Sequence, residues 1–303
     1  MEQQPSGEQF VIRSGGTIAT VVEVGGALRL LAVDGHDLLD GYPSDAVCDG
    51  ARGQSLLPWP NRVRDGRYRW QGQDFQLALT EPTNSCAIHG LTRWENWRCA
   101  VQEPSSVLMT YRLPPQPGWN WGLDLSLHYT VTLSGLTVRT TARNLTGTAA
   151  PFAAGAHPYL RAGSGPIDGA TLNVPARSWL PTDLQQIPDG IESVEDTPYD
   201  FRATRPIGSA VIDHAYRDLQ RDADGLARVR LRGEWVTELW ADRAYPYLQV
   251  FTGDALPDRD RRRQGLGVEP MSAPPNALAS GTDVVTIEPG ATWTGEWGIA
   301  LAE

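Results

Sequence analysis

The sequence predicts an all-β protein built as a large antiparallel β-sandwich. Through most of the chain, apolar and polar residues alternate with a period of two, which is typical of strands with one buried face. These segments are short and are separated by turns rich in glycine and proline, of which the chain has 31 and 23. Segments with a helical period are nearly absent, so a sandwich or barrel of antiparallel strands is the expected architecture.

The clearest strand covers residues 123–133, where every odd position is apolar or aromatic and every even position is polar. Ser134 and Gly135 then form a turn, and residues 136–142 alternate again, which predicts a hairpin. Two short strands are expected around Gly72, within residues 67–79. The same pattern predicts strands at residues 17–24, 27–33, 107–113, 170–174, 226–232, 236–241, 247–252, 283–287 and 292–300.

The length of 303 residues is compatible with two ordinary domains or with one large sandwich. No linker, repeat or change in composition interrupts the strand pattern, so we expect a single domain over residues 1–303. Two loops, residues 43–60 and 254–267, are longer than ordinary connections. Long loops on a rigid sheet are common places for functional sites.

Charge and cysteine content exclude several kinds of partner. The net charge of −10 would repel nucleic acid, and the basic run at residues 259–263 is interpreted as a solvated loop. Cys48, Cys86 and Cys99 lack the spacing of a zinc site or a disulfide framework, which favours reduced thiols in the cytoplasm. No segment has the roughly 18 apolar residues that cross a membrane, so no membrane partner is expected.

Two residues on restricted backbone are candidates for acid/base chemistry. His157 and Glu269 each precede a proline, which disfavours helical backbone for the residue before it. A histidine can both donate and accept a proton near neutral pH, and a carboxylate in a partly apolar setting can act as a base. Taken alone, however, His157 is better explained as a structural histidine hydrogen-bonded to a backbone carbonyl, and only the accompanying stretches favour a catalytic role.

Three further stretches present polar side chains that could hold a ligand. Asn61 and Arg62 follow a loop stiffened by two prolines, and a fixed guanidinium is well suited to binding oxygen atoms. His89 precedes a glycine after a short apolar run, and Asp213 follows two β-branched residues. The structural alternatives are a surface ion pair for Arg62, a strand-end histidine for His89 and a turn cap for Asp213.

The sequence contains no recognisable cofactor or metal motif. The glycines at positions 265 and 267 are not surrounded by a dinucleotide-binding pattern, and we find no metal-ligand cluster, nucleophile elbow or phosphate loop. We therefore expect acid/base chemistry without a cofactor and without a metal.

Taken together, these stretches resemble the aldose 1-epimerase (galactose mutarotase) family. The matching motifs occur in the family's order over most of the chain: Asn61-Arg62 with Gly66 and Tyr68, His89-Gly90, His157-Pro158-Tyr159, Asp213, and Glu269-Pro270. Two features depart from the usual pattern. Leu160 replaces an aromatic residue, and the segment from Leu57 to Pro60 looks like a bacterial subgroup, which leaves the substrate preference open.

The resemblance implies an enzyme that interconverts the α and β anomers of a free hexose such as glucose or galactose. It implies Glu269 as general base and His157 as general acid. Asn61, Arg62, His89 and Asp213 would orient the sugar, which would be the only partner besides a second copy in a homodimer; a monomer is equally compatible.

Aromatic residues could also stack on the apolar face of the sugar, and we expect this of Tyr159 and Trp240. Two alternatives remain open. A hexose-phosphate 1-epimerase would need clustered cations, for which Arg62, Arg64 and Arg93 are candidates. A non-catalytic sugar-binding or regulatory protein could keep the same fold. A glycosidase is less well supported, because it ordinarily uses two catalytic carboxylates.

Overall fold

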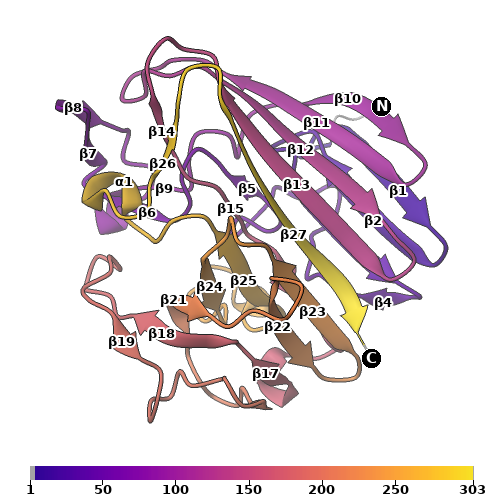
Figure 1. Ribbon diagram of the computed structural model, residues 1–303. Coiled ribbons are helices and arrows are strands. Elements are labelled where there is room, and N and C mark those ends of the chain that lie inside the picture. Colours follow the sequence, from indigo (N-terminus) through magenta and orange to yellow (C-terminus); the bar gives the residue numbers. More distant parts are fainter. Residues whose placement is uncertain (1–3, 303) are drawn as a thin grey trace.

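The computed structural model describes residues 4–302, which form antiparallel β-sheets joined by loops (Figure 1). The largest sheet has nine strands and contains the predicted hairpin. Its spatial order is β10 (Arg98–Glu103), β11 (Ser106–Leu113), β12 (Leu123–Val131), β13 (Gly135–Asn144), β27 (Thr292–Ala302), β23 (Val236–Ala241), β22 (Ala227–Arg232), β17 (Thr171–Asn173) and β20 (Arg205–Pro206).

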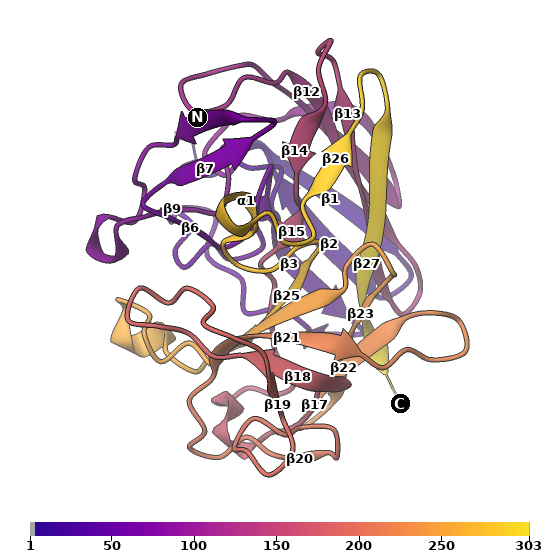
Figure 2. The same cartoon turned by 60° about the vertical axis from the view of Figure 1, so that its left-hand side comes forward.

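A second large sheet has eight strands, with β25 near its centre (Figure 2). Its order is β19 (Glu192–Ser193), β18 (Ala176–Leu180), β21 (Asp213–Leu219), β24 (Tyr247–Phe251), β25 (Leu266–Met271), β15 (Gly155–Ala156) and β5 (Ser55–Leu56), and β16 (Tyr159–Leu160) also pairs with β25. Segments far apart in the sequence therefore meet on β25.

The remaining strands form smaller sheets, most of them in the N-terminal part of the chain. A four-stranded meander contains β1 (Gln9–Ser14), β2 (Thr17–Val22), β3 (Leu28–Val33) and β4 (His36–Asp37). Strand pairs are formed by β6 (Arg62–Arg64) with β9 (Cys86–Ile88), β7 (Arg67–Trp70) with β8 (Gln73–Gln76), and β14 (Ala150–Phe152) with β26 (Val285–Ile287). The helical elements of the described chain are short: α1 (Ala277–Ser280), η1 (Pro82–Asn84), η2 (Ile167–Gly169) and η3 (Arg259–Arg261).

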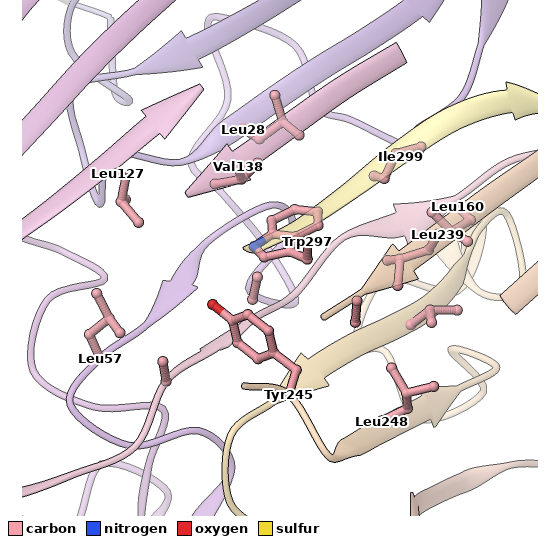
Figure 3. Packing of buried hydrophobic residues seen from close by; sticks show 14 of the residues in the cluster. Leu28, Leu57, Leu127, Val138, Leu160, Leu239, Tyr245, Leu248, Trp297 and Ile299 are labelled. Atoms are coloured by element: carbon pink, nitrogen blue, oxygen red, sulfur yellow. The ribbon is translucent and has the colours of Figure 1, made fainter. Parts of the chain in front are cut away.

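The alternation of the sequence becomes the alternation of burial. In β12 every odd residue from Leu123 to Val131 is buried and every even residue is half-buried. The inward residues of both large sheets join one hydrophobic cluster, in which Trp297 of β27 lies among Val138, Leu239 and Tyr245 (Figure 3). Burial of such side chains contributes about 1.5–3 kcal/mol each, which holds the sheets together.

The all-β prediction is confirmed, and each predicted strand overlaps an observed one. The prediction missed β25, among others, because all six of its residues are buried. A strand covered on both faces has no reason to alternate. No helix in the described part of the chain is long and apolar enough to cross a membrane.

Candidate active site

The central strand β25 positions both candidate acid/base residues. Glu269 lies within this strand, and His157 lies in the two-residue segment between β15 and β16, which both pair antiparallel with β25. Nε2 of His157 is 3.2 Å from Oε1 of Glu269. The backbone N–H of His157 donates to the carbonyl of Gln54 at 3.0 Å, and its own carbonyl accepts from Gly53 at 2.9 Å. The imidazole is therefore carried on backbone that is hydrogen-bonded on both sides.

Burial shifts the pKa values of this pair in opposite directions. Glu269 and His157 are only 2% and 6% exposed. Burial, and then the charge of Asp213, raises the pKa of Glu269 well above its ordinary value. Burial, and then the charge of Arg93, lowers the pKa of His157 to about 3. Both directions favour the uncharged forms of the two side chains.

A cavity of about 270 Å³ opens onto this pair. Its lining contains seven of the eight residues predicted to form the site: Asn61, Arg62, His89, His157, Tyr159, Asp213 and Glu269. Oε2 of Glu269 and Nδ1 of His157 are buried without a hydrogen-bond partner. A buried polar atom without a hydrogen-bond partner lowers stability. Such atoms are rare in folded proteins, and functional sites are one place where they occur.

His89 is fixed as a hydrogen-bond donor toward the cavity. Its Nδ1 accepts from the backbone N–H of Asn61 at 3.1 Å, and its backbone N–H donates to the Asn61 carbonyl at 2.9 Å. Burial and the charge of Arg93 lower the pKa of His89 well below its ordinary value, so the ring is neutral. A neutral imidazole that accepts at Nδ1 carries its proton on Nε2.

Arg62 and Asp213 are each held by a partner that the sequence analysis did not identify. The guanidinium of Arg62 donates two hydrogen bonds to the carboxylate of Glu81, at 2.7 and 2.8 Å. Asp213 accepts from Nε2 of Gln249 at 2.7 Å, and Gln249 lies directly opposite Glu269 in the pairing of β24 with β25. Burial raises the pKa of Asp213, although Arg62 and Gln249 oppose this shift. Gln249 stood out in the sequence as a single polar residue in an apolar strand; nothing marked Glu81.

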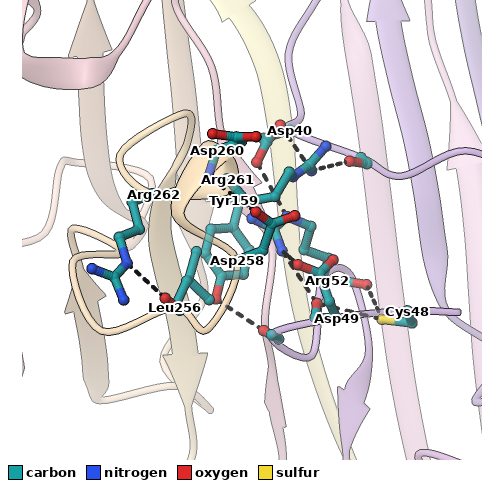
Figure 4. A network of polar contacts seen from close by, with 12 residues as sticks. Asp40, Cys48, Asp49, Arg52, Tyr159, Leu256, Asp258, Asp260, Arg261 and Arg262 are labelled. Carbon is teal, nitrogen blue, oxygen red and sulfur yellow. Dashed lines mark hydrogen bonds and ion pairs between the residues drawn. The ribbon is translucent and has the colours of Figure 1, made fainter. Parts of the chain in front are cut away.

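Tyr159 supports His157. Its ring stacks on the imidazole with centroids 5.0 Å apart, and its hydroxyl donates to the Gly50 carbonyl at 2.9 Å. The guanidinium of Arg52 lies 4.6 Å from the ring centroid. Arg52 is only 1% exposed and forms ion pairs with Asp40 and Asp49 (Figure 4). Tyr159 thus links the imidazole to a buried ionic network.

The basic run at residues 259–263 belongs partly to this network. Arg261 donates to Asp40 at 3.1 Å, and Arg263 forms ion pairs with Asp168 and Asp254 (Figure 4 shows Arg261). The interpretation of the whole run as a solvated loop was therefore wrong for these two residues. Asp40 and Asp168 are distant in sequence from these arginines, and Asp254 lies on the same long loop. A local sequence pattern does not reveal such pairs.

Trp240 lies outside the cavity, in contrast to the expectation. It belongs to β23 and pairs with Gly298 of β27, where a side chain on the glycine would collide with the indole. The indole occupies the space that Gly298 leaves on the nine-stranded sheet, so packing accounts for this tryptophan. Arg64 is also absent from the cavity lining and forms an ion pair with Asp183.

No group of three or more His, Cys, Asp or Glu side chains within residues 4–302 is arranged to hold a metal ion. The fold and the site together define a large antiparallel β-sandwich protein in which a buried histidine and a buried glutamate face a cavity. The chain belongs to the aldose 1-epimerase family, which it matches over residues 8–300.

The chain is also similar to a curated relative and to several solved structures. The uncharacterized protein YihR of Escherichia coli K12 is 32% identical over 286 residues, covering 94% of this chain and 90% of YihR. A GalM/aldose epimerase homologue from C. elegans superposes with a TM-score of 0.85 at 19% identity, covering 98% of this chain and 99% of its own. Galactose 1-epimerase from Lactobacillus acidophilus NCFM superposes with a TM-score of 0.79 at 19% identity, covering 96% and 92%. These structures share the fold.

Proposed function

We propose that this protein is an aldose 1-epimerase that interconverts the α and β anomers of a free aldohexose by opening and closing its ring. The observation that carries the proposal is the 3.2 Å contact between His157 and Glu269, buried at a cavity that several polar side chains line. The cavity volume of about 270 Å³ is at the low end for small-molecule sites, which suits one sugar ring better than a chain of sugars.

Ring opening needs one proton removed from the anomeric hydroxyl and one delivered to the ring oxygen. As the C1–O5 bond breaks, an aldehyde forms at C1; rotation about C1–C2 and closure then give the other anomer. Glu269 acts as the base and His157 as the acid, and closure reverses these roles. The pair gains one proton and gives one away, so its charge is restored after each step.

The shared proton must lie on His157 when the reaction begins. A sugar hydroxyl that donates to Glu269 favours the charged carboxylate, and the proton then passes to the adjacent imidazole. The contact between Nε2 and Oε1 supports this direct transfer. Each positioned acid or base is typically worth about 10² to 10⁴ in rate.

The remaining cavity groups match the polarity of a sugar. Nε2–H of His89 and the guanidinium of Arg62 are donors for oxygen atoms on which negative charge develops. Asp213 is an acceptor for ring hydroxyls, with Gln249 holding its orientation. Asn61 contributes through its backbone, because it fixes the tautomer and position of His89.

The test is the anomerisation of freshly dissolved α-glucose and α-galactose followed by polarimetry. We expect Glu269→Gln and His157→Asn each to lower kcat at least a hundredfold. Glu234→Gln and His36→Asn are matched exposed controls outside the cavity and should retain the wild-type rate. A near-wild-type rate in either site variant would contradict the proposed mechanism.

Two measurements separate the alternatives. Calorimetric titration of the wild-type protein with sugar, in parallel with polarimetry, distinguishes an enzyme from a sugar-binding protein, since the latter binds without accelerating anomerisation. Comparison of glucose with glucose 6-phosphate distinguishes a free-sugar enzyme from a hexose-phosphate 1-epimerase.

A further inference from the structure

The arginines around the cavity differ in whether a carboxylate neutralises them. Arg62 is paired with Glu81, and Arg52 beneath the cavity is paired with Asp40 and Asp49. Arg93 lines the cavity and forms no ion pair with any carboxylate of the described residues. Of the two arginines in the cavity lining, it is the one without a carboxylate partner among the described residues.

Arg93 is nevertheless held in place by a buried side chain. Gln54, which is 1% exposed, donates from Nε2 to the Arg93 carbonyl at 3.0 Å. Its Oε1 accepts from Nη1 of Arg93 at 3.3 Å. The carbonyl of the same Gln54 accepts from the backbone of His157. One residue thus sets the position of Arg93 relative to the imidazole.

A half-buried charge without a counter-ion costs folding free energy, because part of its hydration is lost. Burial accordingly lowers the pKa of Arg93. The hydrogen bond to Gln54 and the Trp94 ring, whose centroid lies 5.7 Å from the guanidinium carbon, hold Arg93 in place but supply no negative charge. An anion bound in the cavity would supply the missing partner with strong, charge-assisted hydrogen bonds.

Arg93 and Asp213 influence different residues of the cavity, although Arg62 acts on both sets. The charge of Arg93 acts on His157 and His89, whereas that of Asp213 acts on Glu269. An anionic group would be repelled beside Asp213 and attracted beside Arg93. The anomeric hydroxyl at Glu269 and an anionic substituent at Arg93 would therefore occupy different sides of one ring.

We propose that the aldose bound best by this cavity carries one negatively charged substituent, such as a carboxylate, away from the anomeric carbon, and that Arg93 binds it. This inference rests on the proposed epimerase function. One guanidinium balances one charge, whereas a phosphate monoester carries about −1.5 to −2 at pH 7. Because Arg62 and Arg64 are paired with carboxylates, the cavity favours a monoanion over a sugar phosphate.

The experiment compares anomerisation rates on four probes: glucose, glucuronate, glucose 6-sulfate and glucose 6-phosphate. In the wild-type protein we expect kcat/KM for at least one of the two monoanionic sugars to exceed that for glucose about tenfold or more, the range of one charge-assisted hydrogen bond. The value for glucose 6-phosphate should lie below that of the preferred monoanion. The ratio of charged to neutral kcat/KM is then measured in Arg93→Gln and Arg93→Lys.

We expect Arg93→Gln to lower this ratio about ten- to a hundredfold, and Arg93→Lys to retain part of it because the charge remains. Arg98→Gln is the matched control: it removes the same charge from an exposed arginine outside the cavity and should leave the ratio unchanged. Equal rates on charged and neutral sugars in the wild-type protein would overturn the inference, as would a ratio unaffected by Arg93→Gln or a preference for the phosphate.

The failure of this inference is distinguishable from the failure of the proposed function. Acceleration on glucose alone keeps the epimerase and overturns the anionic substrate. If no sugar is anomerised, the epimerase proposal fails, and calorimetry with glucuronate and glucose 6-sulfate then decides the inference. Binding to the wild-type protein that is lost in Arg93→Gln supports it, and absence of binding to the wild-type protein overturns it.

Discussion

Oε1 of Glu269 lies 3.2 Å from Nε2 of His157 because the segment that carries His157 pairs with the strand that carries Glu269. Glu269 is part of β25, and the strands on either side of His157, β15 and β16, pair with the two ends of β25. The contact between these two side chains is therefore set by strand register. A shift of one residue would turn Glu269 to the other face of the sheet.

Glu269→Gln should change the pH dependence of stability as well as activity. The folded-state pKa of Glu269 is raised above its ordinary value of 4.5, so the stabilisation from its protonated form is present below 4.5 and is lost as pH rises through the folded pKa. Each unit of pKa difference corresponds to about 1.4 kcal/mol. We expect the Tm of Glu269→Gln relative to wild type to increase between pH 5 and pH 9.

Thermal unfolding of both proteins at these pH values measures this difference. Glu234→Gln is the control, because hydrogen bonds from the backbone and side chain of Ser164 lower the pKa of Glu234. The contribution of that group is complete above pH 5, so the control should show no pH-dependent gain. A constant Tm difference for Glu269→Gln across the range would show that its carboxyl group is not perturbed in the folded state.

Glu81→Gln should impair catalysis although Glu81 is outside the cavity lining. The variant weakens the bidentate ion pair with the Arg62 guanidinium, which then loses its fixed orientation toward the cavity. We expect kcat/KM to fall about tenfold, the size of one charge-assisted hydrogen bond. In the same polarimetric assay, Arg62→Gln should lower kcat/KM more than Glu81→Gln does. Asp183→Asn breaks the comparable Arg64 pair away from the cavity and should leave the rate unchanged; an equal loss there would point to a general effect on folding.

Arg52→Ala should strongly destabilise the protein. Arg52 is buried against the Tyr159 ring and compensates Asp40, which is itself only 6% exposed. Removing one partner of a buried pair typically costs about 3–5 kcal/mol, because the other charge stays buried. Urea unfolding measures the loss. In Arg52→Ala combined with Asp40→Asn, part of it should be recovered; an additive loss would contradict the pairing.

Trp94→Ala should weaken sugar binding more than the chemical step. The indole lines the cavity and is 54% exposed beside Arg93, so the core does not account for its position. We expect KM to rise about three- to tenfold, the value of an aromatic contact, with kcat changed little. Steady-state polarimetry separates the two constants. Leu184→Ala, at a fully exposed apolar residue outside the cavity, should change neither, and a Trp94→Ala enzyme with wild-type KM would remove this residue from the site.

Local patterns were sufficient for about half of the strands, including the long ones of the nine-stranded sheet, and for naming the candidate acid/base residues. In β12 and β13 one face packs on the core, so apolar and polar residues alternate and the strands can be predicted from the sequence. His157 and Glu269 could be recognised because prolines restrict their backbone and because motifs elsewhere resemble a family in the same order. Seven predicted residues converge on one cavity, since the strands and turns that carry them meet around β25.

The sequence by itself determined the all-β fold class, the family and the residues that could perform acid/base chemistry, because these depend on periodicity and residue type. Only the tertiary structure decided which charges are neutralised: Glu81 pairs with Arg62, Asp183 with Arg64, and Arg93 is left without a carboxylate. Ion pairs form between side chains that the fold brings within a few ångströms of each other. The number of residues between two side chains in the sequence does not predict that distance. For the same reason, only the structure placed Trp240 outside the cavity and Gln249 opposite Glu269.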